Sequence, residues 1–86
     1  MPIAPIVNIN GSSKKSLKED LKKALIKIQE VIPVLSACNP HGRDYQISPS
    51  GDYEVARAEH LERMVALQKI ETDLFEIYIN IENQGK

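Results

Sequence analysis

Apolar residues recur at intervals of three and four along two long stretches of the chain. In the first stretch the recurring positions are Leu17, Leu21, Leu25, Ile28, Ile32 and Leu35. This spacing places the apolar side chains on one face of an α-helix. We therefore expect a first helix that begins at residues 13–16 and extends to about residue 37.

Polar residues mark the start of this helix, and a proline interrupts it. Ser16 followed by Glu19 fits a capping box, and Ser13 is an alternative cap. Pro33 lies inside the pattern and removes the backbone hydrogen bond to the carbonyl of Gln29. A kink or an early end of the helix is therefore expected at Pro33.

A second apolar pattern extends from Tyr53 to about Asn83 without a glycine or a proline. Its expected stripe consists of Val55, Ala58, Leu61, Val65, Ile70, Leu74, Ile77, Tyr78 and Ile81. Asp52 or Ser50 can cap the first turn. We predict a second helix over residues 52–83, and the two helices together predict an all-α, antiparallel helical hairpin domain over residues 13–86.

The last turns of the second pattern are the most apolar part of the chain. Within residues 73–83, isoleucines and a phenylalanine alternate with more polar residues, which also fits a β-strand that could pair with Ile6 to Asn10. We favour the helix because no turn residue separates this stretch from the helix before it.

The predicted helices differ in length, roughly 45 Å for the second against roughly 33 Å for the first. An antiparallel hairpin of such helices leaves the last turns of the second helix without a partner. A large exposed apolar patch usually marks an interface. We therefore predict a homo-oligomer, most simply a dimer that forms a four-helix bundle, with the interface residues Leu74, Phe75, Ile77, Tyr78 and Ile81.

The composition restricts the class of protein. A chain of 86 residues forms one small domain, and it has 11 basic against 12 acidic residues and a net charge of -1. Proteins that bind duplex nucleic acid usually carry a basic excess, so this partner is not expected. No apolar run is long enough for a signal peptide or a membrane span. We expect a cytoplasmic protein with neither a membrane partner nor a cofactor.

Two segments outside the apolar stripes have open interpretations. Residues 1–12 contain two prolines and predict an extended arm, whose isoleucines press on an apolar surface or which frays as a tail. The outer face of the first helix carries a lysine cluster that is either solvated or the rim of an anionic pocket in an oligomer. Its members are Lys14, Lys15, Lys18, Lys22, Lys23 and Lys27.

The connection between the helices, residues 39–51, is the candidate functional segment. It has about thirteen residues, whereas helical bundles commonly use roughly two to eight. Its chemically capable residues are His41, Gly42, Arg43, Asp44 and Tyr45. Arg43 offers a planar fork to a phosphate, Tyr45 offers a face to a base, and Gly42 permits a bend with positive φ. We predict a site for a small anionic or nucleotide-like ligand, unless these side chains serve the fold instead.

Two other kinds of chemistry are considered for the same segment. Cys38 and His41 have C-x-x-H spacing, and His60 with Asp44 or Asp52 could complete a metal site. Alternatively, Cys38 could act as a nucleophile with a histidine as its base. A buried thiol at Cys38 and a surface His60 beside two glutamates explain these residues more simply. We therefore predict neither a metal site nor an enzyme.

The tract from Cys38 to Asp44, placed between two helices, resembles the helical-hairpin domain of small phage proteins that sequester cyclic-nucleotide or cyclic-ADP-ribose immune signals. Cys38, Pro40, Arg43 and Asp44 match in type the Cys-Pro-Pro-Ser-Arg-Glu-like turn of that family. The extra residues of this loop leave only Arg43 as a transferable phosphate contact. The resemblance implies a non-enzymatic oligomer that hides a signalling nucleotide. The alternative is a structural or adaptor protein that works through its helical faces.

Overall fold

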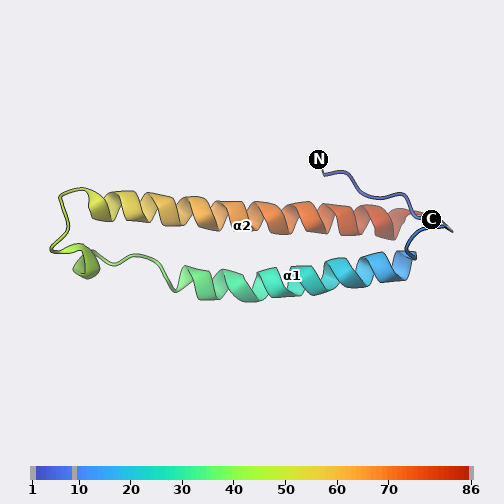
Figure 1. Cartoon of the computed structure of the whole chain (residues 1–86), viewed down its shortest axis with the longest axis horizontal. Helices are drawn as coiled ribbons and strands as arrows, with labels where there is room; N and C mark the ends of the chain where they lie inside the picture. The colour runs from blue at the N-terminus through green and yellow to red at the C-terminus, as the bar shows by residue number, and fades with distance from the viewer. Residues whose placement is uncertain (1, 9, 86) are drawn as a thin grey trace.

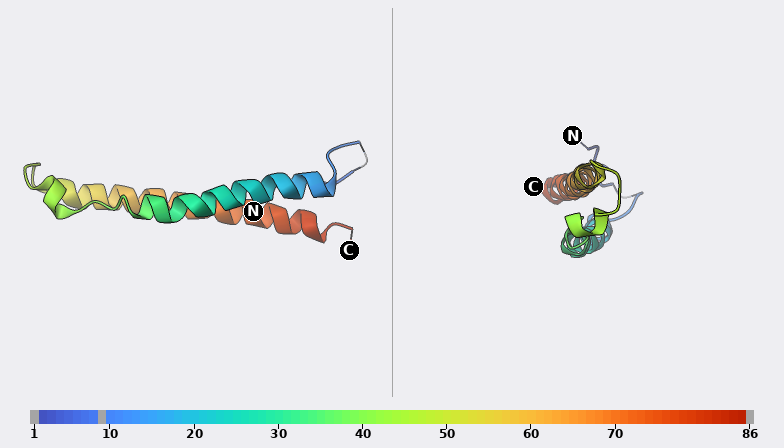
Figure 2. Two further views of the ribbon diagram at one scale, coloured as in Figure 1. Left: turned by 90° about the horizontal axis from the view of Figure 1, so that it is seen from below. Right: turned by 90° about the vertical axis from the view of Figure 1, so that its left-hand side faces the viewer.

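The computed structural model describes residues 2–8 and 10–85, and this part of the chain is helical with no strand (Figure 1). Helix α1 spans Lys14–Ser36, the 3₁₀ helix η1 spans Gly42–Tyr45 and helix α2 spans Asp52–Asn83. The two long helices run in opposite directions (Figure 1), and the end-on view of Figure 2 shows them as neighbours. The molecule measures 61 × 22 × 19 Å. The all-α hairpin is confirmed, and residues 73–83 are helical, as predicted.

The helices contact each other along one seam on each. The seam of α1 is the predicted one, from Leu17 to Leu35, and every member is buried or half-buried. The seam of α2, which we call the inner seam, consists of His60, Met64, Leu67, Glu71, Leu74, Tyr78 and Ile81. Among the described apolar residues only Leu25 and Ile81 are buried. Two helices alone therefore enclose a thin core.

The inner seam differs from the stripe that the sequence predicted for α2. Leu74, Tyr78 and Ile81 belong to both sets, whereas Leu61 and Val65 remain more than half exposed. Since α2 carries apolar residues on two sides, its periodicity alone does not decide which side meets α1. The prediction was therefore wrong for the first half of the helix.

The predicted overhang lies at the opposite end of the molecule. The last turns of α2 pack against the start of α1, where Lys18 forms an ion pair with Glu82 and Ile81 is fully buried. The first turns of α2 instead extend past the end of α1, alongside residues 37–51 (Figure 1). A long loop allows this offset because it can span the extra length. The prediction of unpartnered last turns was wrong, and Ile81 belongs to the core of the hairpin.

The helix ends show which capping signals operate. Ser13 caps α1, because its hydroxyl oxygen accepts a hydrogen bond of 3.0 Å from the backbone N–H of Ser16. Ser16 therefore lies inside the helix, and only the alternative cap was right. The N-cap of α2 is Gly51, with φ of 94° and no side-chain hydrogen bond, so neither predicted cap serves there. Helix α1 continues through Pro33 and ends at Ser36.

The segment before α1 is attached to the C-terminal end of α2 through one side chain. The Gln84 amide accepts a hydrogen bond of 2.8 Å from the Val7 N–H and donates one of 2.9 Å to the Pro5 carbonyl. Ile3 and Ile6 are exposed, whereas Ile9 lies outside the described residues. Backbone groups rather than these two isoleucines therefore attach the arm.

We call the two ends of the hairpin the terminal end (residues 2–8, 10–25 and 72–85) and the loop end (residues 36–64). Within the part of the chain that the structure describes, no helix is both long and apolar enough to cross a membrane.

Candidate functional site

Four of the five predicted ligand-binding residues lie on the surface of the loop end. Residues 42–45 form η1, and the backbone N–H of Asp44 donates a hydrogen bond of 3.0 Å to the carbonyl of His41. His41, Gly42, Arg43 and Asp44 are exposed, and Tyr45 is half-buried. The short helix and its N-cap residue therefore present the Arg43 guanidinium and the His41 imidazole to solvent.

The predicted role of Gly42 as a bend with positive φ was wrong. Among the described glycines, positive φ occurs only at Gly51 and Gly85. A Cβ at Gly42 would lie 3.8 Å from the Tyr53 ring, which is an ordinary contact. The left-handed position in this loop is Gly51, directly before α2, where the chain reverses into the helix.

Two aromatic rings attach η1 to the first turns of α2. The rings of Tyr45 and Tyr53 have centroids 6.0 Å apart at an interplanar angle of 42°. The Arg57 guanidinium carbon lies 5.7 Å from the Tyr53 centroid, within the range of a cation–π contact. Tyr45 therefore contributes to the packing of the loop. The Arg43 guanidinium, in contrast, has no hydrogen bond or ion pair with any other described residue.

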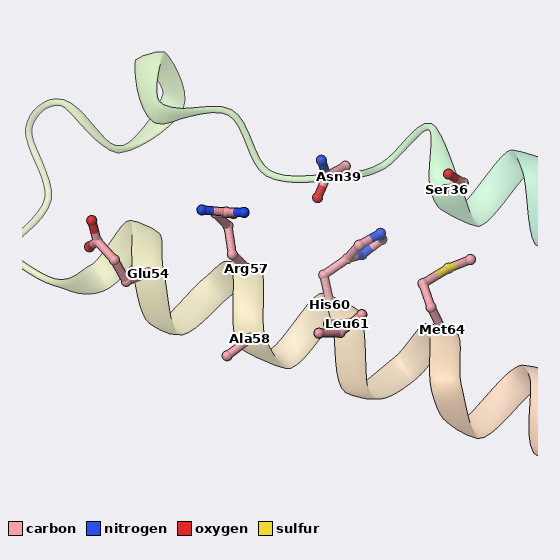
Figure 3. Close-up of a pocket in the computed structure, with 8 residues that line it drawn as sticks. All are labelled: Ser36, Asn39, Glu54, Arg57, Ala58, His60, Leu61 and Met64. Carbon is pink, nitrogen blue, oxygen red and sulfur yellow. The ribbon is translucent and has the colours of Figure 1, made fainter.

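A cleft of about 440 Å³ opens between the end of α1 and the first turns of α2 (Figure 3). Figure 3 shows Arg57, His60 and Met64 projecting from α2 toward the segment that carries Ser36 and Asn39, whereas Ala58 points away. His60 is only 8% exposed, so the expectation of a surface histidine was wrong. The lining of the cleft combines hydrogen-bonding groups with apolar side chains: Ser36, Asn39, Glu54, Arg57, Ala58, His60, Leu61 and Met64.

None of the five predicted ligand-binding residues lines this cleft, and of its α2 residues the sequence suggested only His60, as a possible metal ligand. A signal was present in the sequence, because His60, Met64 and Leu67 continue the three-four spacing of the inner seam. A histidine in such a register is expected to face the partner helix. The contribution of Ser36 and Asn39 depends on the offset between the helices, which the spacing does not reveal.

The alternative metal site is not assembled. Among the described residues no three or more of His, Cys, Asp and Glu come together in a way that could hold a metal ion. Cys38 is exposed rather than buried, and its thiol donates a long hydrogen bond of 3.6 Å to the carbonyl of Val34. The expectation of a buried thiol at this position was therefore wrong.

A second cleft, of about 450 Å³, lies in the lysine cluster of α1 at the terminal end. It is lined by Lys14, Lys15, Lys18, Glu19, Lys22 and Tyr78. Lys18 pairs with Glu82 and lies 5.6 Å from the Tyr78 centroid, and Lys15 lies 4.0 Å from Glu19. The hydrogen bond to Glu82 raises the pKa of Lys18 above its ordinary value of 10.5. Acidic groups of the same chain thus already partner two of these ammonium groups.

A third cleft, of about 280 Å³, lies between the two helices. Leu25 and Gln29 of α1 and Glu71, Thr72 and Phe75 of α2 line it. It opens beside an extensive apolar surface, because many large apolar side chains of the hairpin remain exposed. Those on the two long helices are Ile26, Val31, Val34, Val55, Leu61, Val65, Ile70, Phe75 and Ile79.

Comparison with protein-family models, curated protein sequences and solved structures found no match to this chain. The case for a function therefore comes from the chain itself.

Proposed function

We propose that this protein acts through protein–protein contact, as a non-catalytic hairpin that assembles with copies of itself into a helical bundle. The observation that supports this proposal is the distribution of apolar side chains. More of the large apolar residues are exposed than buried, and they lie on both helices. A bundle of four helices would enclose such residues in a common core.

The total surface area points the same way. The chain exposes 6666 Å², whereas a compact monomer of its mass is expected to expose about 5,100 Å². The excess of about 1,500 Å² is comparable to the area that one subunit of an obligate dimer hides. Part of the excess reflects the elongated shape of two packed helices, and assembly would correct that shape as well.

Analytical ultracentrifugation of the full chain tests this proposal directly. At working protein concentrations we expect a mass of at least twice the 9.7 kDa of one chain. The melting temperature should also rise with protein concentration, because assembly stabilises the folded state by mass action. A monomer at every concentration, with a concentration-independent melting temperature, would overturn the proposal.

A second candidate function is the binding of a small anionic or nucleotide-derived ligand at the loop. It is favoured by the position of Arg43, which is exposed and lies two residues before Tyr45. The Arg43 guanidinium has no hydrogen bond or ion pair with another described residue. A guanidinium and an aromatic face are suited to a phosphate and a base. Sequestration of a signalling nucleotide would follow from tight binding of this kind.

Calorimetric titration with cyclic AMP and with cyclic ADP-ribose tests this second function. Arg43→Ala should abolish binding, and its stability should stay near that of the wild type because Arg43 is exposed. Arg63→Ala is the matched control, since it removes an exposed arginine of α2 away from η1. If neither probe gives a heat of binding, or if Arg43→Ala and Arg63→Ala weaken binding equally, the loop is not the binding site.

A further inference from the structure

Helix α2 carries a second stripe of exposed positions at heptad spacing, which we call the outer seam. Its members are Ala58, Leu61, Val65, Gln68, Thr72, Phe75 and Ile79, all of them exposed and none of them charged. Members from Leu61 to Ile79 follow the inner seam by one residue, which places the stripe about 100° further around the helix. From Ala58 to Ile79 the outer seam is about 32 Å long.

Alternating steps of three and four give a mean period of 3.5 residues, which is the repeat of helices that pack lengthwise against another helix. Helices whose outer face meets only water usually carry charged residues at such positions. The remaining exposed face of α2 carries such charges, with Glu59, Glu62 and Arg63 beside the apolar Val55 and Ile70. The outer seam therefore has the composition of a contact surface.

We propose that the outer seam packs against the outer seam of a second copy, with the two α2 helices antiparallel. This inference rests on the proposed function and specifies its interface. In the register centred on Ile70, Leu61 meets Ile79 of the second copy, and Val65 meets Phe75 of the second copy. Gln68 then meets Thr72 of the second copy near the two-fold axis, where the amide and the hydroxyl can form a hydrogen bond.

The order of residues along the outer seam supports this symmetric arrangement. From Leu61 to Ile79 the seam has two apolar, two polar and two apolar positions. A two-fold axis requires a surface that is complementary to itself. The antiparallel register satisfies this requirement at every layer, because apolar residues meet only apolar residues and the two polar residues meet each other.

Charge favours the antiparallel direction over the parallel one. The acidic residues of α2 after Ile70 have no basic residue among them: Glu71, Asp73, Glu76 and Glu82. Parallel helices would place these acidic halves side by side, and like charges repel. In the antiparallel arrangement each acidic half instead lies beside a half whose charges nearly cancel, with Arg57, Arg63 and Lys69 against Asp52, Glu54, Glu59 and Glu62.

The available area suits a stable dimer. If each chain hid only half of its excess of about 1,500 Å², the two would together bury about 1,500 Å², which is the size of a standard stable protein–protein interface. The clefts beside the outer seam would receive side chains of the second copy. Thr72 and Phe75 border one of these clefts, and Ala58 and Leu61 border another.

Disulfide cross-linking tests the register. In a Cys38→Ser background, the double variant Leu61→Cys with Ile79→Cys should form a covalent dimer under mild oxidation. These positions are about 27 Å apart within one helix, too far for an internal disulfide. The single variant Leu61→Cys should stay uncross-linked, since its two copies are equally far apart. A covalent dimer of the single variant would indicate parallel helices and overturn the proposal.

A matched pair of charge variants tests the surface itself. Val65→Glu places a carboxylate in the outer seam and should give a helical monomer by sedimentation and circular dichroism. Val55→Glu is the control, because Val55 is an equally exposed valine of α2 outside the seam, 59% against 57%. It should stay a dimer. If the protein remains an oligomer with Val65→Glu and the double cysteine variant does not cross-link, this interface is wrong but the proposed function stands. If the wild type is a monomer, both the interface and the proposed function are wrong.

Discussion

Each end of α2 buries one side chain against the rest of the hairpin, Ile81 at the terminal end and His60 at the loop end. Ile81 is fully buried and apolar, whereas His60 is 8% exposed and lines an open cleft. Burial of an isoleucine stabilises the fold by removing apolar surface from water. Burial of an imidazole costs solvation unless hydrogen bonds replace it. The two ends therefore contribute unequally to stability.

Polar contacts follow the same division. At the terminal end Lys18 pairs with Glu82, and the Lys14 ammonium donates a hydrogen bond of 2.9 Å to the Gln84 carbonyl. At the loop end the contacts are between aromatic rings and a guanidinium, and the N-cap of α2 has no side-chain hydrogen bond. Polar contacts thus attach the helices to each other more closely at the terminal end than at the loop end. The loop end has the cleft beside His60 and an Arg43 side chain with no hydrogen bond or ion pair to another described residue.

Ile81→Ala should have the largest effect, because it creates a cavity in the core at the terminal end. We expect a loss of about 2–5 kcal/mol in the free energy of unfolding. Urea denaturation at a fixed protein concentration measures it. Ile70→Ala is the control, since Ile70 is 49% exposed on the same helix, and it should lose less than about 1 kcal/mol. Similar losses in the two variants would contradict the contrast between buried and exposed positions.

Gly51→Ala should have the next largest effect and tests the loop end. With φ of 94°, an L-residue at this position costs about 1–2 kcal/mol, and the cost should appear as a lower urea midpoint. Gly42→Ala, in the same loop, should leave the midpoint nearly unchanged, because the position does not have positive φ and the added Cβ meets only an ordinary contact. An equal shift in both variants would show that loop composition matters rather than the left-handed residue.

The helix bounds could be predicted from the sequence because the local signals agree. Three-four periodicity, the absence of glycine and proline from 53 to 83 and a serine cap at residue 13 all act over short distances. The choice between Ser13 and Ser16 was ambiguous, since both are serines at the start of the lysine-rich first helix. The inward side of α2 and the offset of the helices depend on packing between distant residues, and Val65 and Ile81 were misplaced for this reason.

The candidate site was predictable only in part for the same reason. Residues 41–45 are chemically capable and lie in an exposed turn, which follows from the loop length and from Pro40. The cleft at His60 requires Asn39 and α2 to be neighbours in space, and that depends on how far the long loop lets α2 extend past α1. A shorter loop would have allowed a better prediction, because it restricts how far α2 can be displaced along α1.

His60→Leu should have a smaller effect on the free energy of unfolding. This effect should be a gain, whereas Ile81→Ala should cause a loss. The imidazole has no hydrogen bond to any other described residue, so an apolar side chain of similar size should stabilise the hairpin by about 1 kcal/mol or less. His41→Leu, at an exposed position of the loop, serves as the control and should change little. Clear destabilisation by His60→Leu alone would indicate that the loop-end cleft depends on the imidazole.

Lys18→Met should show the smallest effect, visible as a change with pH. The hydrogen bond to Glu82 raises the pKa of Lys18 above 10.5. The folded state therefore holds this proton more tightly than the unfolded chain, and the stabilisation is fully present below pH 10.5. It is lost as the pH rises through the folded-state pKa. The stability difference between wild type and variant should thus be constant from neutral pH and shrink at the alkaline end. Lys15→Met is the control. It removes a far more exposed ion pair at 4.0 Å and should lower the free energy of unfolding by less at every pH. If the stability difference for Lys18→Met does not change with pH, the alkyl stem over Tyr78, rather than the charge, stabilises the terminal end.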